Sequence, residues 1–136
     1  MTDLLYKELS YKIQGAIFTV YKAFGNGFKE NVYHNSLLEE LKSTNIIEVA
    51  SQKRINIFYR DKKVGVYVPD FIIEDSIIVE IKCKPRITAD DLRQFWYYLK
   101  GSEYKVGCLV NFGQPGKVEM IRRVYDTARI KTRILA

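Results

Sequence analysis

The stretch that decides the fold is Ile77–Cys83, which reads Ile-Ile-Val-Glu-Ile-Lys-Cys and lies between a turn at Ser76 and a break at Pro85. A β-branched run of this length predicts a buried strand. Side chains alternate across a strand, so Glu80 and Lys82 share one face while their apolar neighbours cover the other. Charges on such a strand must pair, bind a metal or reach water. A lone Glu-x-Lys occurs by chance in many proteins, so this stretch alone favours an exposed ion pair on an amphipathic strand.

An acidic residue just before this strand favours a metal site over an exposed Glu80–Lys82 ion pair. Asp70 follows Pro69 at the start of a short predicted strand over 70–73, and a tight turn leads from there into the strand that carries Glu80. A hairpin brings the two carboxylates close together, where they repel unless a cation lies between them. Paired oxygen ligands suit Mg²⁺ or Mn²⁺. Lys82, beside such an ion, could position a water and offset phosphate charge.

The remaining periodicity predicts one α/β domain over residues 1–136. Apolar spacing predicts helices over 4–24, 28–42 and 89–100, and alternation predicts strands over 55–59, 64–68, 70–73, 77–83 and 104–110, with a turn at 60–63 and a last strand or helix start at 118–125. Thr88 and Asp91 resemble a capping box at the third helix. The order predicts a mixed central sheet flanked by helices, with an N-terminal helix over 1–24, a core over 25–125 and a basic segment over 126–136.

Polar residues on two of the predicted helices have two explanations each. Glu30 lies on the same helical stripe as Tyr33, so it points into a polar site or, equally, stabilises the first turn through the helix dipole. Gln94 and Tyr98 are four residues apart and share a face of the third helix. They line a site or form an ordinary pair at the edge of the apolar stripe.

Charge and cysteine content narrow the class of protein. The net charge is +6, and residues 117–136 contribute +4 of it from six basic and two acidic residues. A polyanion contact and a solvated tail explain this segment equally. Cys83 and Cys108 form no CxxC cluster, which argues against structural zinc and favours a reducing, cytoplasmic setting, with a disulfide between them as the open alternative. The N-terminus lacks signal-peptide features, and no apolar run has membrane-spanning length.

Four motifs in order resemble a known group of enzymes. Pro69-Asp70 followed by Glu80-Ile81-Lys82 resembles the PD-(D/E)XK signature of the restriction-endonuclease-like nucleases, whose core order is α-β-β-β-α-β. Residues 27–33 read G-x-x-E-x-x-Y, the motif of the GxxExxY family within that superfamily. Residues 94–99 resemble its Q-x-x-x-Y-L helix, and residues 111–113 its N-F-G. The resemblance covers most of the chain, from about Gly25 to Arg123.

The resemblance implies roles for individual residues. Asp70, Glu80 and the backbone carbonyl of Ile81 would bind the metal, and Lys82 would orient or activate the water. Glu30 would contact the metal, often through water, and Gln94 would support the site. Tyr33 and Tyr98 would form walls that touch the substrate, and Lys84, Arg86, Arg93, Arg122 and Arg123 would hold the nucleic-acid backbone. Pro69 fits the broad superfamily better than the smaller family, and residues 83–86 are more basic than expected.

These roles predict a Mg²⁺- or Mn²⁺-dependent phosphodiesterase that hydrolyses nucleic acid by attack of a metal-activated water, with DNA favoured over RNA. One alternative is a module of the same fold that binds nucleic acid or protein without cutting it. Another is an interaction protein that forms a homodimer through its long first helix, since the ten tyrosines suit an interface as well as a small core.

Overall fold

Three helices and seven strands occupy the part of the chain that the computed structural model describes, residues 6–46 and 48–125. In chain order they are α1 (Lys7–Phe24), α2 (Glu30–Ser43), β1 (Val49–Ser51), β2 (Ile55–Tyr59), β3 (Lys62–Tyr67), β4 (Phe71–Ile73), β5 (Ile77–Lys82), α3 (Ala89–Gly101), β6 (Val106–Asn111) and β7 (Glu119–Val124). The predicted α/β class is confirmed, and the last element is a strand. Residue 4, where the first helix was expected to begin, and the basic segment 126–136 lie outside the described residues.

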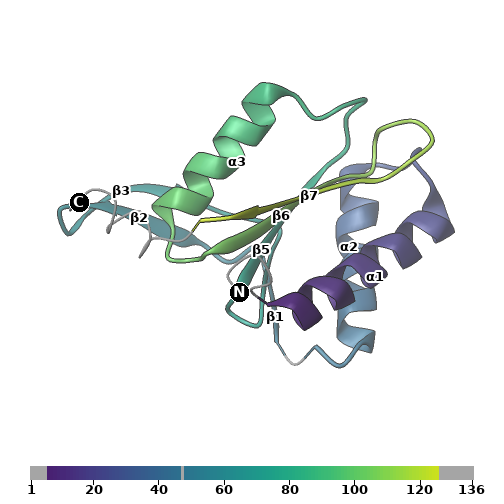
Figure 1. The fold of residues 1–136 in the computed structure, drawn as a ribbon, viewed down its shortest axis with the longest axis horizontal. Helices are drawn as coiled ribbons and strands as arrows, with labels where there is room; N and C mark the ends of the chain where they lie inside the picture. Colours follow the sequence, from purple (N-terminus) through teal and green to yellow (C-terminus); the bar gives the residue numbers. More distant parts are fainter. Residues whose placement is uncertain (1–5, 47, 126–136) are drawn as a thin grey trace.

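A five-stranded mixed sheet forms the centre of the fold, in the order β1-β4-β5-β6-β7 (Figure 1). β4 pairs antiparallel with β1 and β5, β5 and β6 run parallel, and β7 closes the sheet antiparallel to β6. A parallel pair needs a crossover connection, and α3 supplies it between β5 and β6. β6 is buried along all six residues, as expected for an inner strand covered on both faces.

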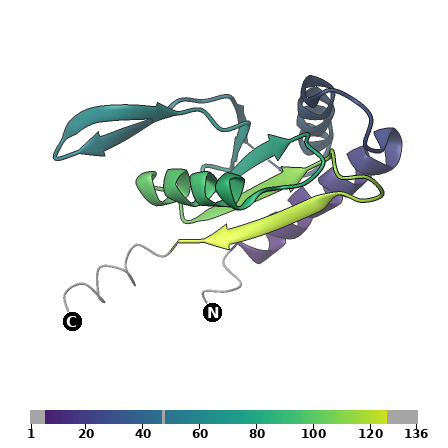
Figure 2. The ribbon, with the colours of Figure 1, turned by 90° about the horizontal axis from the view of Figure 1, so that it is seen from above.

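Helices cover both faces of this sheet, α1 and α2 on one side and α3 on the other (Figures 1 and 2). Val79 and Ile81 of β5 belong to the core cluster that includes the buried faces of α1 and α2. Ile78, one position away, belongs to the cluster that includes Phe95 and Leu99 of α3. Because side chains alternate along a strand, Glu80 is on the α3 side of β5. The two apolar layers therefore hold the charged end of β5 from both faces.

Asn111, at the end of β6, locks the chain that leaves β5. Its side-chain oxygen accepts hydrogen bonds from the N–H groups of Lys84 (3.1 Å) and Gly113 (3.0 Å), and its amide nitrogen donates to the carbonyl of Lys84 (2.9 Å) and to Glu119 (3.1 Å). Gly113 is required here because a Cβ would lie 2.4 Å from the backbone nitrogen of Lys84. The N-F-G sequence thus fixes the backbone directly after Lys82.

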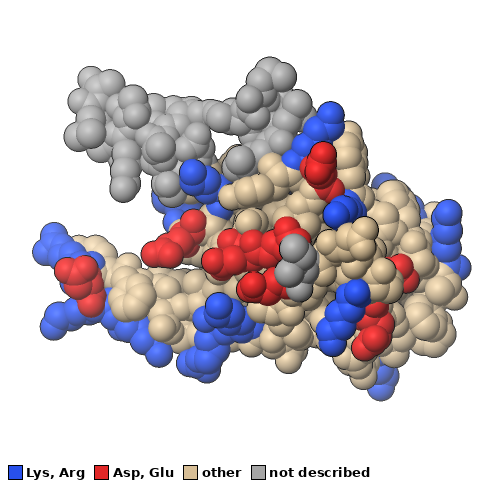
Figure 3. Space-filling view, turned by 90° about the horizontal axis from the view of Figure 1, so that it is seen from below, with Lys and Arg blue, Asp and Glu red and all other residues tan. Residues whose placement is uncertain are grey.

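The β2–β3 hairpin forms a separate two-stranded sheet that projects beyond the central one (Figures 1 and 2). Its base packs on α3, with Ile55, Ile57 and Tyr67 in the α3-side core. Only Arg60 and Asp61 form its turn, both with positive φ, so the turn is shorter than the predicted 60–63. Figure 3 shows Lys and Arg side chains gathered at this end of the molecule.

The two cysteines are free thiols in the structure, Cys108 buried and Cys83 half-buried. Burial raises the pKa of Cys83 to about 11 and that of Cys108 to about 12. The disulfide alternative is therefore not realised. Among the described residues, no helix is both long and apolar enough to cross a membrane.

Candidate active site

Asp70 stands at the entrance to β4 and is held by two hydrogen bonds. Its Oδ2 accepts the backbone N–H of Ile81 (2.7 Å), and its Oδ1 lies 2.8 Å from Nδ1 of His34. The side chain is only 13 % exposed. An ionised carboxylate has about four lone-pair positions, so these two bonds leave acceptor capacity on both oxygens. Asp70 is oriented and still able to bind a cation.

Glu80, the second acid, lies half-buried on β5 beside Asp70. Burial and the neighbouring Asp70 carboxylate raise the pKa of Glu80 to about 7, although Lys82 and the backbone N–H of Asp70 act in the opposite direction. A pKa this high means that the protein alone disfavours the charged form of Glu80, which a bound cation would favour. The pairing of Phe71 with Val79 puts the two acids at adjoining ends of β4 and β5, and Asp70 is close enough to act on Glu80.

Glu30 begins α2 and lies within electrostatic reach of the same group. Glu30 is exposed at the surface, but partial desolvation, and then Asp70, raise its pKa, whereas Lys82 and His34 lower it. Glu30 and His34 are four residues apart, so both project from the same side of the first turns of α2. Glu30, Asp70, Glu80 and Lys82 therefore lie within electrostatic reach of one another.

His34 is a site residue that the sequence analysis did not identify. It stacks on Phe71, with ring centroids 4.5 Å apart, and its Nε2 lies 3.0 Å from the hydroxyl of Ser51. Because an ionised carboxylate only accepts hydrogen bonds, the Nδ1–H of His34 donates to Asp70. In the sequence, only its position one helical turn after Glu30 points to a role for His34 in the site. Its contact with Asp70 joins residues 36 positions apart, so no local sequence pattern predicts it.

A tyrosine pair forms the wall of the site on the α3 side. Tyr67 and Tyr98 stack with ring centroids 4.2 Å apart and an interplanar angle of 3°. The Tyr67 hydroxyl is buried and makes no hydrogen bond of good geometry within the described residues. Burial, and then the Glu80 carboxylate, raise its pKa, so its phenol stays protonated beside Glu80. A buried hydroxyl this close to Glu80 is placed to donate to that carboxylate or to a molecule bound beside it.

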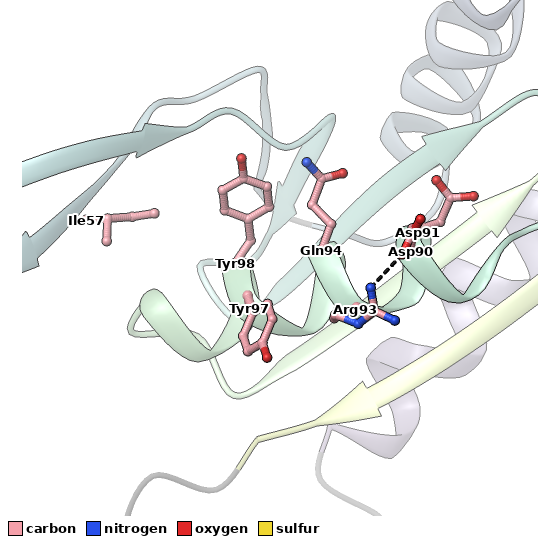
Figure 4. Close-up of a pocket in the computed structure, with 7 residues that line it drawn as sticks. All are labelled: Ile57, Asp90, Asp91, Arg93, Gln94, Tyr97 and Tyr98. Carbon is pink, nitrogen blue, oxygen red and sulfur yellow. Dashed lines mark hydrogen bonds and ion pairs between the residues drawn. The ribbon is translucent and has the colours of Figure 1, made fainter.

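A cleft of about 600 Å³ opens between α3 and the β2–β3 hairpin. Gln94, Tyr97 and Tyr98 of α3 line it, and Gln94 and Tyr98 point the same way from the helix (Figure 4). The side chain of Gln94 is exposed, and Ile57 of β2 lies across from it. The prediction that Gln94 and Tyr98 share a helix face is confirmed.

Several other predicted contact residues lie elsewhere or are already engaged. Tyr33 is fully buried: its hydroxyl donates to the carbonyl of Gly25 (2.6 Å), and its ring stacks on Phe112, so it is a core residue and not an open wall. Lys84 binds the Asp91 carboxylate at 2.8 and 2.9 Å.

The remaining basic residues differ in their distance from the acids. Arg93 pairs with Asp90, one turn away on α3. Arg86 is exposed on the loop before α3. Arg122 and Arg123 lie on β7, which β6 separates from β5, so the structure does not bring them to the carboxylates.

The donor set fits a hard cation with few protein ligands. No group of three or more His, Cys, Asp or Glu side chains within the described residues converges to hold a metal. Two neighbouring carboxylates, Asp70 and Glu80, repel each other, and a cation between them would relieve this repulsion. Together with a backbone carbonyl they suit Mg²⁺ or Mn²⁺, which keep several water ligands. In an extended strand the N–H and C=O of one residue point to the same side, and the N–H of Ile81 points at Asp70. The carbonyl of Ile81 therefore faces the same region.

Comparisons with known proteins identify the family of the chain. No curated protein sequence matches the chain. A similar solved structure is that of SSO0001, with 23 % sequence identity and a TM-score of 0.47 over 74 % of this chain; the match spans about half (52 %) of SSO0001. Residues 7–124, which include Asp70, Glu80 and Lys82, match the PD-(D/E)XK nuclease superfamily. The chain belongs to the PD-(D/E)XK nuclease superfamily.

Proposed function

We propose that the protein is a metal-dependent phosphodiesterase that hydrolyses nucleic acid, with DNA favoured over RNA. The single observation that carries this proposal is the placement of Asp70 beside Glu80 at adjoining ends of β4 and β5, with Lys82 two residues further along β5. Membership of the superfamily supports the class of reaction. The preference for DNA rests on analogy with that superfamily alone.

The residues around the acids have separable tasks. Asp70, Glu80 and the carbonyl of Ile81 would hold Mg²⁺ or Mn²⁺, and His34 would keep the Asp70 carboxylate in its orientation. A bound divalent ion would supply Lewis acidity and lower the pKa of a water. Glu30, on the α2 side, would accept a hydrogen bond from water near the ion.

Lys82 would act on the reacting groups directly. Its ammonium group would orient the water and offset the negative charge that builds up on the phosphate oxygens. The reaction adds water across one P–O bond, with the hydroxyl going to phosphorus and the proton to the leaving sugar oxygen. Gln94, which lines the cleft, would hydrogen-bond the substrate strand, and the Tyr67 hydroxyl would donate to a group bound beside Glu80.

A binding module without hydrolysis is the rival function. All three groups of the signature are present and close together, and a protein that only binds nucleic acid has no need for paired carboxylates that repel its ligand. Membership of the narrower GxxExxY family, a cytoplasmic location and a homodimer remain predictions.

Cleavage of labelled single-stranded, duplex and branched DNA tests the proposal. The assay compares Mg²⁺, Mn²⁺ and EDTA, for wild type beside Asp70→Ala, with the folding of each protein confirmed by thermal unfolding. We expect products that require the metal and are absent with the variant. Salt-sensitive binding without products from any substrate, RNA included, would instead establish the binding module.

A further inference from the structure

The β2–β3 hairpin carries exposed aromatic rings among an excess of cations. The side chains of Phe58 and Tyr59 are 60 % and 61 % exposed. Five basic residues and one acid lie between positions 53 and 63, and all six are exposed: Lys53, Arg54, Arg60, Asp61, Lys62 and Lys63. The guanidinium of Arg60 lies over the Tyr59 ring, 5.2 Å from its centroid. Aromatic rings interleaved with cations are typical of surfaces that contact single-stranded nucleic acid.

Packing within the fold does not explain these rings. Core contacts hold only the base of the hairpin, through Ile55, Ile57 and Tyr67. Beyond them Val64 and Phe58 are 62 % and 60 % exposed. Exposed apolar side chains clustered on one projecting element usually mark a binding surface.

The hairpin also leads directly to the carboxylates. Asp70 follows the end of β3 by three residues, and Tyr67, the last residue of β3, lies beside Glu80. Ile57 of the hairpin and Gln94 and Tyr98 of α3 line the cleft between these two elements (Figure 4). A second cleft, of about 390 Å³, is lined by Lys53, Arg54 and Phe58 at the base of the hairpin. A strand held at Asp70 can therefore continue over the hairpin.

We propose that the β2–β3 hairpin binds unpaired nucleotides of the substrate that wrap around it. Phe58 with Lys63 on one face, and Tyr59 with Lys62 on the other, supply rings that stack on bases and cations that contact phosphates. This inference rests on the proposed function and adds the form of the substrate: a single strand or a single-stranded extension of a duplex. The bases of a closed duplex are stacked on each other and offer no free face to an exposed ring. The basic residues match a polyanion (Figure 3), which favours nucleic acid over an apolar protein partner.

Binding of two labelled probes tests the hairpin. The probes are an oligothymidylate of about 20 nucleotides, longer than one binding site, and a closed hairpin duplex of similar length. Fluorescence anisotropy is measured in EDTA, so that no cleavage occurs. For Phe58→Ala combined with Tyr59→Ala we expect at least about tenfold weaker binding of the single strand, because each stacked base contributes about 1–3 kcal/mol. Binding of the duplex changes little.

A charge variant separates stacking from phosphate contact. Lys62→Gln combined with Lys63→Gln should lower the slope of log affinity against log salt by about 1.4, since each phosphate contact on a single strand contributes about 0.7. The matched controls lie on α1, where Tyr11 and Phe18 are 61 % and 45 % exposed and Lys12 and Lys22 are also exposed. Tyr11→Ala with Phe18→Ala, and Lys12→Gln with Lys22→Gln, should bind as wild type does.

The outcomes separate this inference from the proposed function. If wild type binds and cleaves but the hairpin variants bind the single strand as well as wild type does, the hairpin inference is wrong and the nuclease stands. If wild type neither binds nor cleaves any nucleic acid, the proposed function itself fails. If the aromatic variant changes only self-association, measured by light scattering, the surface belongs to a second copy of the chain and the inference is overturned.

Discussion

Replacing Glu80 by glutamine is predicted to stabilise the metal-free protein at neutral pH. The pKa of Glu80 is raised from an ordinary value of 4.5 to about 7 in the folded state. Between these two values the folded state holds a proton that the unfolded state has lost, so stability falls as the pH rises through this window. Each pKa unit corresponds to about 1.36 kcal/mol, which gives an upper limit of about 3 kcal/mol at pH 7 and above.

The expected gain is smaller than this limit, about 1–3 kcal/mol, because Asp70 shares the repulsion and relaxes with it. Glutamine keeps the shape of Glu80 and removes the charge, so Glu80→Gln should gain this stability at pH 7.5 and little at pH 4.5. Urea unfolding in EDTA at both pH values measures the difference. Glu39→Gln, at an exposed position on α2, is the matched control and should show no such dependence.

Added metal should make wild type more stable than Glu80→Gln, the reverse of the order expected in EDTA. Wild type gains RT ln(1 + [metal]/Kd) when Mg²⁺ or Mn²⁺ binds, and Glu80→Gln loses a ligand and gains less. A variant that is destabilised in EDTA by the same amount at pH 4.5 and pH 7.5 would refute the reasoning. That result would mean that Glu80 is a well-solvated or well-paired carboxylate.

Three further predictions follow from the same contacts. His34→Leu, which removes the donor to Asp70, should weaken Mn²⁺ binding about tenfold or more in calorimetry, whereas His34→Asn, whose amide can replace Nδ1–H, should retain most of the affinity; equal loss in both variants would count against an orienting role. The affinity for Mn²⁺ should fall about tenfold per pH unit below pH 7, where Glu80 becomes protonated, and level off above it; a flat profile from pH 5 to 8 would contradict this. Gly113→Ala should cost about 1–3 kcal/mol in urea unfolding, because its Cβ meets the backbone after β5, while Gly27→Ala, with open space around it, should not.

The parts of the fold that could be predicted from the sequence are those with strong local periodicity. β5 and its two charged residues follow from side-chain alternation along a β-branched run. The capping box of Thr88 and Asp91 forms as predicted, with each side chain accepting the other's backbone N–H. β1 could not be predicted, because it has only three residues and its pairing with β4 is a long-range contact.

The site was predictable where a motif marks it and unpredictable where tertiary contacts decide. Asp70, Glu80 and Lys82 are spaced in a recognisable order, and the structure brings them together. His34 reaches Asp70 only after α2 packs against the sheet. Tyr33 carries a motif position, yet its role is to close the loop between α1 and α2 from within the core. Lys84 looked like a phosphate contact, but Asp91 of the capping box binds it.

The most direct test of the central claim is a comparison of DNA cleavage by wild type and Lys82→Ala in Mn²⁺. Lys82 is assigned to the reacting groups and not to the metal, so the variant should bind Mn²⁺ in calorimetry and bind DNA, yet cleave at least about 10²-fold more slowly. Lys42→Ala, at an exposed position in the last turn of α2, should cleave as wild type does. Equal cleavage by wild type and Lys82→Ala, or no metal-dependent cleavage by wild type of any nucleic acid, would contradict the assignment of this site as a nuclease.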